Sequence, residues 1–229
     1  MSTGSNPSQL SPLMRALFSF AGIGALLFTA AGTVQWLGAW VFLFEIALGG
    51  LVIEWWLAKR DPELLAERRS TRGQVAWDRI LTRIIPLLWL GWLPLMAIDA
   101  ARFQWSSVPG WLQCVGAAIL AASFFLVYLT YRENSYAAPV VKIQRDRGHI
   151  AVTTGPYEYV RHPIYASGLL SYLGTPLLLG SWYGLAIVPV MSALLAVRAV
   201  MEERMLKAEL DGYREYAARV RYRLLPRVW

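Results

Sequence analysis

The feature that most constrains this chain is a series of long apolar runs. Four of them each have about the 20 residues that a helix needs to cross the core of a bilayer. They cover residues 13–34, 36–58, 80–100 and 111–131. Two shorter runs, 164–179 and 182–200, follow so closely on one another that they predict a helical hairpin. Because backbone polar groups must be paired in lipid, the runs predict helices. We expect an all-α, polytopic membrane bundle of about six hydrophobic helices, four spans plus the hairpin, with a cytoplasmic C-terminal helix.

The composition agrees with a membrane protein. Only 16% of the residues are charged, against roughly a quarter in soluble domains, and the mean hydropathy is +0.41. The 11 tryptophans and 11 tyrosines suit the aromatic belts of the two membrane interfaces. The single cysteine, Cys114, excludes a disulfide framework and a cysteine-based zinc site, and we expect no bound metal.

The N-terminal region allows two interpretations. Residues 1–12 are rich in Ser, Pro, Asn and Gly and predict a mobile tail. A cleaved signal peptide is the alternative, because Arg15 precedes an apolar stretch that ends in TAAG. The further spans and the weakly basic start favour a retained first span.

Basic residues in the loops indicate the orientation. The loop of residues 59–79 holds six of them, whereas the loop between the third and fourth spans holds only Arg102. By the positive-inside rule, both termini, the 59–79 loop and the segment after Tyr131 face the cytoplasm, in a multi-pass protein of the cell (inner) membrane. This distribution explains the net charge of +7 without a nucleic-acid partner, and none is expected.

The polar segment TTGPYEYVRHPIYASG, residues 153–168, interrupts this apolar pattern. Pro163 suits the first turn of a helix, which puts His162 at the N-cap. The free N–H groups there, together with Arg161, predict a site for a carboxylate or phosphate. The alternative is that these side chains only anchor the helix at the lipid headgroups.

An acidic pair lies where the hairpin returns to the same side. Glu202 and Glu203 follow the last apolar run, so we expect them near Arg161 and His162. A cationic end and an acidic end facing one pocket suit a zwitterionic ligand. Four further side chains recur at helical spacing and predict one helix face: Tyr213, Tyr216, Val220 and Arg223.

Three motifs in this order, HIAVTTGPYEYVRHPIYASG, EER and GYREYAARVRYRLLP, resemble the isoprenylcysteine carboxyl methyltransferase family. That family belongs with the phosphatidylethanolamine N-methyltransferase-like membrane enzymes. The resemblance covers roughly residues 130–229 and departs from the pattern at Ala166-Ser167. It implies the cofactor S-adenosyl-L-methionine, bound in a cytoplasm-facing pocket.

Residue by residue, the resemblance also implies a binding site. The implied cofactor-binding residues are Asn134, His149, Gly155, Tyr157, Arg161, His162, Pro163, Tyr165, Gly168, Glu202, Glu203, Tyr213 and Tyr216. Arg223 and Glu203 are the candidate catalytic residues. We expect Arg161 and the helix start to hold the methionyl carboxylate, and one of the two glutamates to hold the ammonium group or the ribose hydroxyls.

The sequence therefore predicts a membrane methyltransferase with a lipophilic acceptor: a prenylcysteine-type carboxylate, a phospholipid amine or a small thiol. Residues 13–131 would form the acceptor side, and residues 132–229 the cofactor-binding connector, hairpin and C-terminal helix. A gap at Ala166, Ser167 and Gly168 would admit a lipid tail. The alternatives are an NADPH-dependent reductase resembling membrane steroid reductases and an inactive structural or transport component. The partners are the bilayer and a lipid-like substrate, and no signal defines an oligomeric state.

Acidic residues within the spans are functional candidates by default. Glu45 and Glu54 are nine residues apart and should point to opposite faces of their helix. For Glu54 an ion-paired structural role is an equal alternative. Asp99 and Arg102, three residues apart on the outer side, predict a surface pair.

Overall fold

A computed structural model describes residues 11–229, and within them the fold is all-helical, as predicted. The six long helices are α1 (Pro12–Ala31), α2 (Leu37–Arg60), α4 (Asp78–Ala97), α5 (Gly110–Glu133), α6 (Pro163–Leu179) and α7 (Trp182–Glu209). The short elements are α3 (Pro62–Glu67), α8 (Tyr213–Arg219), the π-helical turn η1 (Ile98–Arg102) and the 3₁₀ turns η2 (Arg145–Arg147) and η3 (Gly155–Glu158). The tail predicted over residues 1–12 lies outside the described residues, except that α1 already begins at Pro12.

Five helices of the described chain are long and apolar enough to cross a membrane. They are α1, α2, α4 with η1, α5 and α7. The sixth, α6, has 17 residues and packs between α5 and α7 in the hairpin that the sequence predicted. The chain is therefore a multi-pass helical membrane protein.

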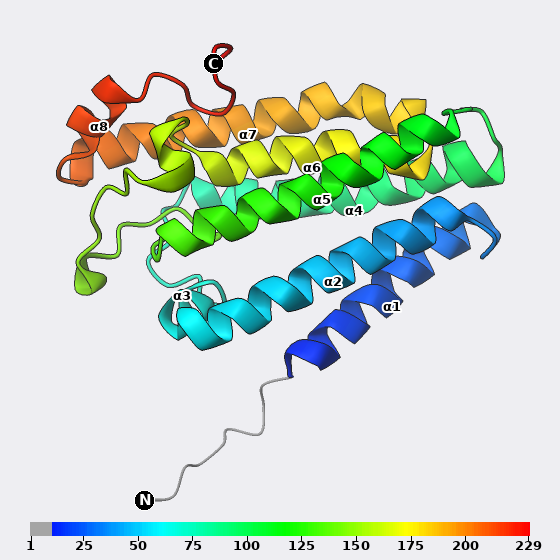
Figure 1. Cartoon of the computed structure of the whole chain (residues 1–229), viewed down its shortest axis with the longest axis horizontal. Coiled ribbons are helices and arrows are strands. Elements are labelled where there is room, and N and C mark those ends of the chain that lie inside the picture. The colour runs from blue at the N-terminus through cyan, green and yellow to red at the C-terminus, as the bar shows by residue number, and fades with distance from the viewer. Residues whose placement is uncertain (1–10) are drawn as a thin grey trace, which may run out of the picture.

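The long helices lie side by side along the longest axis of the molecule (Figure 1). At one end of the bundle, which we call the connector end, α3, α8 and the connector of residues 134–162 gather (Figure 1). Helices α2, α5 and α7 end there, and α4 and α6 begin there. The even number of passes remains a prediction, because five of the six long helices are long and apolar enough to cross a membrane. The orientation relative to the cytoplasm also remains a prediction.

Helix α7 continues past the apolar run of residues 182–200 to Glu209, so Glu202 and Glu203 lie within the helix. The helix face predicted after it was wrong in part. Helix α8 ends at Arg219, so Val220 and Arg223 do not continue its face. The reason is the extended backbone at Val220, after which the chain turns back toward the start of α6.

Helices α5 and α6 approach each other closely because glycines line their contact. A Cβ atom on Gly116 would lie 2.4 Å from the backbone nitrogen of Leu178, and one on Gly174 would lie 2.8 Å from the carbonyl oxygen of Gly116. Small residues allow such backbone approach between membrane helices. The tight pair fixes the position of α6, whose first turn carries part of the candidate site.

At the opposite end of the bundle the predicted surface pair of Asp99 and Arg102 was wrong. Asp99 is fully buried, and its Oδ2 accepts hydrogen bonds from the hydroxyls of Ser106 at 2.6 Å and Ser181 at 2.5 Å. Ser181 caps the N-terminus of α7, which draws the carboxylate inward. Arg102 instead donates to the carbonyl oxygen of Ala30.

The two acids of α2 do have different surroundings. Glu54 forms ion pairs with Arg15 at 3.2 Å and Arg69 at 3.3 Å, which supports its structural alternative. Glu45 lines an apolar groove between α2 and α5, beside Phe124. Two separate faces of the helix are thus used, as the nine-residue spacing predicted.

Candidate active site

A cavity of about 300 Å³ lies at the connector end, a volume at the lower limit of the range of small-molecule sites. Its wall is built from the end of α5, the connector, the start of α6, the second half of α7, and α8. One further residue, Arg68, comes from the segment just after α3. The cavity therefore joins segments that are far apart in the sequence.

Most of the predicted site residues lie on this wall. They are Asn134, His149, Tyr157, Arg161, His162, Tyr165, Glu202, Tyr213 and Tyr216. The remaining predicted residues are not among the lining residues; these are Gly155, Pro163, Gly168, Glu203 and Arg223. The structure therefore brings the predicted motifs together, and it separates direct wall residues from supporting ones.

Three of the supporting residues shape the backbone. Gly155 has a positive φ of 59°, and a Cβ atom there would lie 2.5 Å from the side chain of Glu133. Pro163 occupies the first turn of α6, with His162 at the N-cap, as predicted. A Cβ atom on Gly168 would lie 3.0 Å from Leu195, so this glycine sits at the contact between α6 and α7. All three act on the site through its geometry.

Three wall residues have a buried polar atom without a hydrogen-bond partner within residues 11–229. They are Arg161, at Nε of a guanidinium that already pairs with Glu203, and His162 and Tyr213, at Nε2 and the hydroxyl. His162 and Tyr213 are 5% and 4% exposed. The His162 ring stacks on Tyr165 at 5.4 Å, and burial is the main cause that lowers the pKa of His162, so the ring is neutral near pH 7. Because unsatisfied buried polar groups are costly, these atoms indicate a polar ligand.

Tyrosine hydroxyls tie the wall together. The side-chain amide of Asn134 donates to the Tyr157 hydroxyl at 2.6 Å, and the Tyr216 hydroxyl donates to the Tyr157 carbonyl oxygen at 2.8 Å. These bonds connect the end of α5, η3 and α8. Burial also raises the pKa values of Tyr157, Tyr213 and Tyr216, so all three remain protonated hydrogen-bond donors near pH 7.

An ion cluster behind the wall changes the predicted roles of Arg161 and Glu203. Glu203 is 2% exposed and pairs with Arg161 at 3.1 Å, Lys207 at 2.6 Å and Arg223 at 2.6 Å. Arg161 also donates to the carbonyl oxygens of residues 217 and 220, each at 3.1 Å. Their charges are therefore used on each other, and this geometry does not favour the expectation that they hold the two ends of a zwitterion.

The same cluster fixes the C-terminal segment against the start of α6. The backbone N–H groups of Arg161 and His162 donate to the carbonyl oxygens of Tyr222 and Arg223, both at 2.9 Å. Together with the Glu203–Arg223 pair, these bonds close one side of the cavity. A catalytic role for Glu203 and Arg223 stays a prediction, since neither lines the cavity.

Some wall residues were not predicted from the sequence. Arg198 donates to Asp78 at 2.8 Å and to the carbonyl oxygen of Pro139 at 2.6 Å, and its guanidinium lies 5.5 Å from the ring centre of Tyr165. Asp78, its partner, is fully buried. Both residues lie at the border of an apolar run, and an ionisable residue in that position could have been taken from the sequence as a candidate for the site. Arg68 was counted only as a basic loop residue, and nothing in its local spacing marks it.

Fold and site thus define a multi-pass membrane protein with a polar, aromatic-walled cavity at one end of its helices. Residues 111–210 match the family described as phospholipid methyltransferase. An 83-residue segment is 34% identical to Protein-S-isoprenylcysteine O-methyltransferase of Schizosaccharomyces pombe. That segment is 35% of this chain and 35% of the relative, so the chain spans about a third of the curated relative's length. The family resemblance predicted from the motifs is confirmed over this part of the chain.

Proposed function

We propose that this chain is an integral membrane methyltransferase that uses S-adenosyl-L-methionine and acts on a lipophilic acceptor. The observation that carries the proposal is the cavity whose wall includes His162 Nε2 and the Tyr213 hydroxyl, both buried and without a hydrogen-bond partner in the described chain. Both lie at the connector end, and His162 lies within the stretch that is similar to phospholipid methyltransferases. The match to this family favours a methyl donor as the ligand of the cavity.

The residues of the wall fit such a cofactor. The rings of Tyr157, Tyr213 and Tyr216 offer apolar contacts with polar edges for a nucleoside. His162 and Asn134 offer hydrogen bonds for its hydroxyls and ring nitrogens. When bound, S-adenosyl-L-methionine supplies a methyl group that its sulfonium already makes electrophilic. The protein then has to hold two reactants in line and keep water out, and positioning of this kind can supply about 7–11 kcal/mol.

An apolar groove beside the cavity suits the lipophilic acceptor. It has a volume of about 440 Å³, and η3 contributes to both the groove and the cavity. The groove is lined mainly by Leu126, Leu129, Tyr159, Val160, Ala166, Leu170, Leu224 and Leu225. A methyl acceptor at its polar end, with its hydrocarbon chain along the groove, would reach the cavity from the membrane.

This groove replaces the gap that the sequence predicted at Ala166, Ser167 and Gly168. Ser167 is 3% exposed and donates to the carbonyl oxygen of Ile164 at 2.6 Å, and Gly168 faces Leu195. Only Ala166 borders the groove. The acceptor would therefore lie on the α5 side of Ala166, as a prenylcysteine-type carboxylate, a phospholipid amine or a lipid-like thiol.

Equilibrium binding to the detergent-purified chain tests the proposed function. Saturable binding of S-adenosyl-L-methionine, with transfer of its radiolabelled methyl group to a component of a lipid extract, is the expected result. NADPH serves as the comparison ligand, since a reductase would bind it instead. Binding of NADPH without binding of the methyl donor would overturn the proposal.

We also propose that the connector end faces the cytoplasm. The support is the distribution of basic residues, six in the 59–79 loop against Arg102 alone in the loop at the other end. Single cysteines at Arg69 and Ser107, both exposed, test this in a Cys114→Ser background, because Cys114 is itself exposed. A membrane-impermeant reagent applied from outside should label position 107 and not position 69, and the reverse pattern would contradict the orientation.

A further inference from the structure

Some charged side chains on the cavity wall form ion pairs and others do not. The charged lining residues are Arg68, Lys142, Arg161, Arg198 and Glu202. Three of them pair with carboxylates that are not on the wall: Lys142 with Glu67, Arg161 with Glu203, and Arg198 with Asp78. Arg68 and Glu202 form no direct ion pair among residues 11–229, and the side chain of each is hydrogen-bonded only to a tyrosine, Arg68 to Tyr131 and Glu202 to Tyr165. One cation and one anion without a direct ion-pair partner thus face the same cavity.

Arg68 is placed to use its charge on a ligand. Its guanidinium lies 4.5 Å from the ring centre of Tyr131 and shares a hydrogen bond with that side chain. A guanidinium has five N–H donors, so most of them remain available to a ligand. The adjacent Arg69 differs, since it is exposed and pairs with Glu54 at 3.3 Å. The two neighbouring arginines therefore have different surroundings, and only Arg68 lines the cavity.

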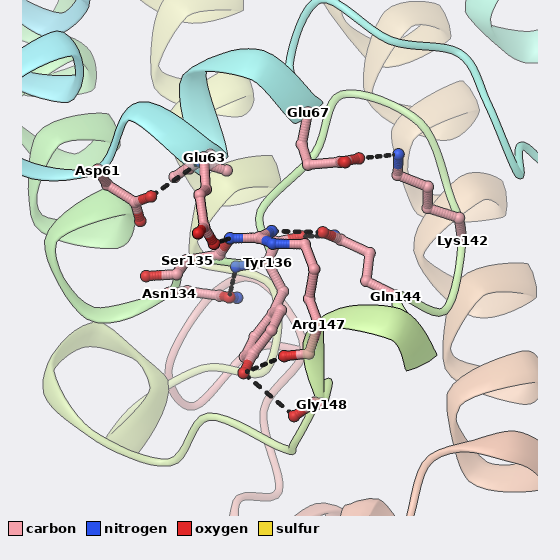
Figure 2. A network of polar contacts seen from close by, with 11 residues as sticks. Asp61, Glu63, Glu67, Asn134, Ser135, Tyr136, Lys142, Gln144, Arg147 and Gly148 are labelled. Atoms are coloured by element: carbon pink, nitrogen blue, oxygen red, sulfur yellow. Dashed lines mark hydrogen bonds and ion pairs between the residues drawn. The ribbon is translucent and has the colours of Figure 1, made fainter.

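A polar network joins α3, the helix that ends just before Arg68, to the connector (Figure 2). Arg68 directly follows α3, whose Glu67 pairs with Lys142 and whose Glu63 pairs with Arg147 at 3.4 Å. Both cations belong to the connector, which contributes other lining residues to the cavity. Arg147 is in turn held by Gln144 at 2.5 Å and by the carbonyl oxygen of residue 135 at 2.8 Å. The connector thus fixes the helix that presents Arg68.

Glu202 faces the cavity because of the rotation of α7. Successive helix residues differ by about 100°, so Glu203 points into the ion cluster while Glu202 points to the wall. Glu202 accepts a hydrogen bond from the Tyr165 hydroxyl, which orients one carboxylate oxygen. The carboxylate of Glu202 forms no direct ion pair in the described part of the chain, and Arg198 acts on its charge only from a longer distance.

We propose that Arg68 binds the carboxylate, and Glu202 the ammonium group, of the amino-acid end of the methyl donor. The inference rests on the proposed function and deepens it. A ligand end with both charges satisfies both groups at once through charge-assisted hydrogen bonds. The segment after α3, outside the region that matches the methyltransferase family, then completes the cofactor site.

Two ligands separate the two roles. S-adenosyl-L-methionine carries both charges of its amino-acid end, whereas its decarboxylated analogue keeps only the ammonium group. In the purified full-length chain, Arg68→Ala should lower the affinity for S-adenosyl-L-methionine about 10-fold or more and leave the analogue's affinity unchanged, since one charge-assisted bond is lost. Glu202→Gln should lower the affinity for both ligands by a similar factor.

Matched controls come from the same elements. Arg69→Ala alters the neighbouring arginine, and Glu209→Gln alters an exposed glutamate of α7 that pairs with Arg145. Both variants should bind both ligands as the wild type does. Arg68→Lys serves as a second variant that keeps the charge, and it should retain a preference for the carboxylated donor.

The inference fails if Arg68→Ala leaves both affinities unchanged or lowers both equally while thermal unfolding shows an intact fold. It also fails if Arg68→Lys loses the preference for the carboxylated donor. A wild-type chain that binds neither ligand contradicts the proposed function itself. The two failures are therefore distinguishable in one set of titrations.

Discussion

The two ends of the bundle use buried polar residues in different ways. At the opposite end, Asp99 Oδ2 accepts hydrogen bonds from the hydroxyls of Ser106 and Ser181, and Ser106 accepts one from the backbone N–H of Trp182. At the connector end, His162 Nε2 and the Tyr213 hydroxyl face a cavity without a partner in the described chain. The first group links loops to the start of α7, and the second is available to a ligand.

The comparison shows that the residue type alone does not tell whether a polar residue between hydrophobic helices stabilises the fold or binds a ligand. A carboxylate that accepts hydrogen bonds from serine hydroxyls at the start of a helix stabilises the fold. A histidine or tyrosine that is buried beside a cavity and has no partner indicates a missing ligand. Asp99 Oδ1 also has no partner in the described chain, so the connector end is distinguished by the cavity beside its unpaired atoms. The following variants test that distinction from the largest expected effect to the smallest.

The largest effect is expected from Glu203→Ala, which would show that the connector end also contains structural charge. The change leaves Arg161, Lys207 and Arg223 without their shared carboxylate, and breaking a buried pair typically costs about 3–5 kcal/mol of folding free energy. Thermal unfolding in detergent measures the loss. A variant as stable as the wild type, with weaker binding of S-adenosyl-L-methionine, would return Glu203 to the cofactor site.

A smaller loss of stability is expected from Asp99→Ala at the opposite end. The hydroxyls of Ser106 and Ser181 lose a charged acceptor, which typically costs about 1.5–3 kcal/mol. The same unfolding experiment measures this loss, and the folded fraction should bind S-adenosyl-L-methionine with unchanged affinity. A reduced affinity would mean that the two ends are coupled.

Tyr213→Phe should leave the stability of the fold unchanged and lower the affinity for S-adenosyl-L-methionine. The hydroxyl has no partner in the described chain, so its removal costs the fold nothing, while one lost neutral hydrogen bond of about 1 kcal/mol lowers affinity about 5-fold. Tyr216→Phe is the matched control, because its hydroxyl already donates to the Tyr157 carbonyl oxygen. The control should lose stability instead, and identical behaviour of the two variants would break the comparison.

The smallest effect is expected from the titration of His149, which is only partly buried. Burial first, and the positive charge of Arg147 second, lower the pKa of His149 to about 4. Since the unfolded value is about 6.5, the unfolded state binds the proton more readily, so stability falls as pH drops from about 6.5 toward 4. Unfolding midpoints between pH 7 and 4.5 should fall less in His149→Gln than in the wild type, and equal slopes would contradict this.

Hydropathy and turn chemistry predicted the parts of this structure that depend on neighbouring residues. The six helices follow from apolar runs, and the start of α6 follows from Pro163 with His162 before it. The choice between Glu202 and Glu203 did not follow, because it depends on the rotation of α7 as set by its packing. Arg68 was missed for a related reason, since ion pairs between α3 and the connector bring it to the cavity.

The glycine contact between α5 and α6 restricts how substrates can be exchanged. At Gly116 and Gly174 the two backbones leave no room for even one methyl group, so a hydrocarbon chain cannot pass between these helices. An acceptor that arrives from the bilayer, and the methylated product that leaves, would have to move along the groove beside Ala166. Since α5 and α6 also line this groove, their glycine contact would keep two of its sides fixed. Passage of the acceptor would then require movement of the other segments that border it, η3 and the C-terminal residues.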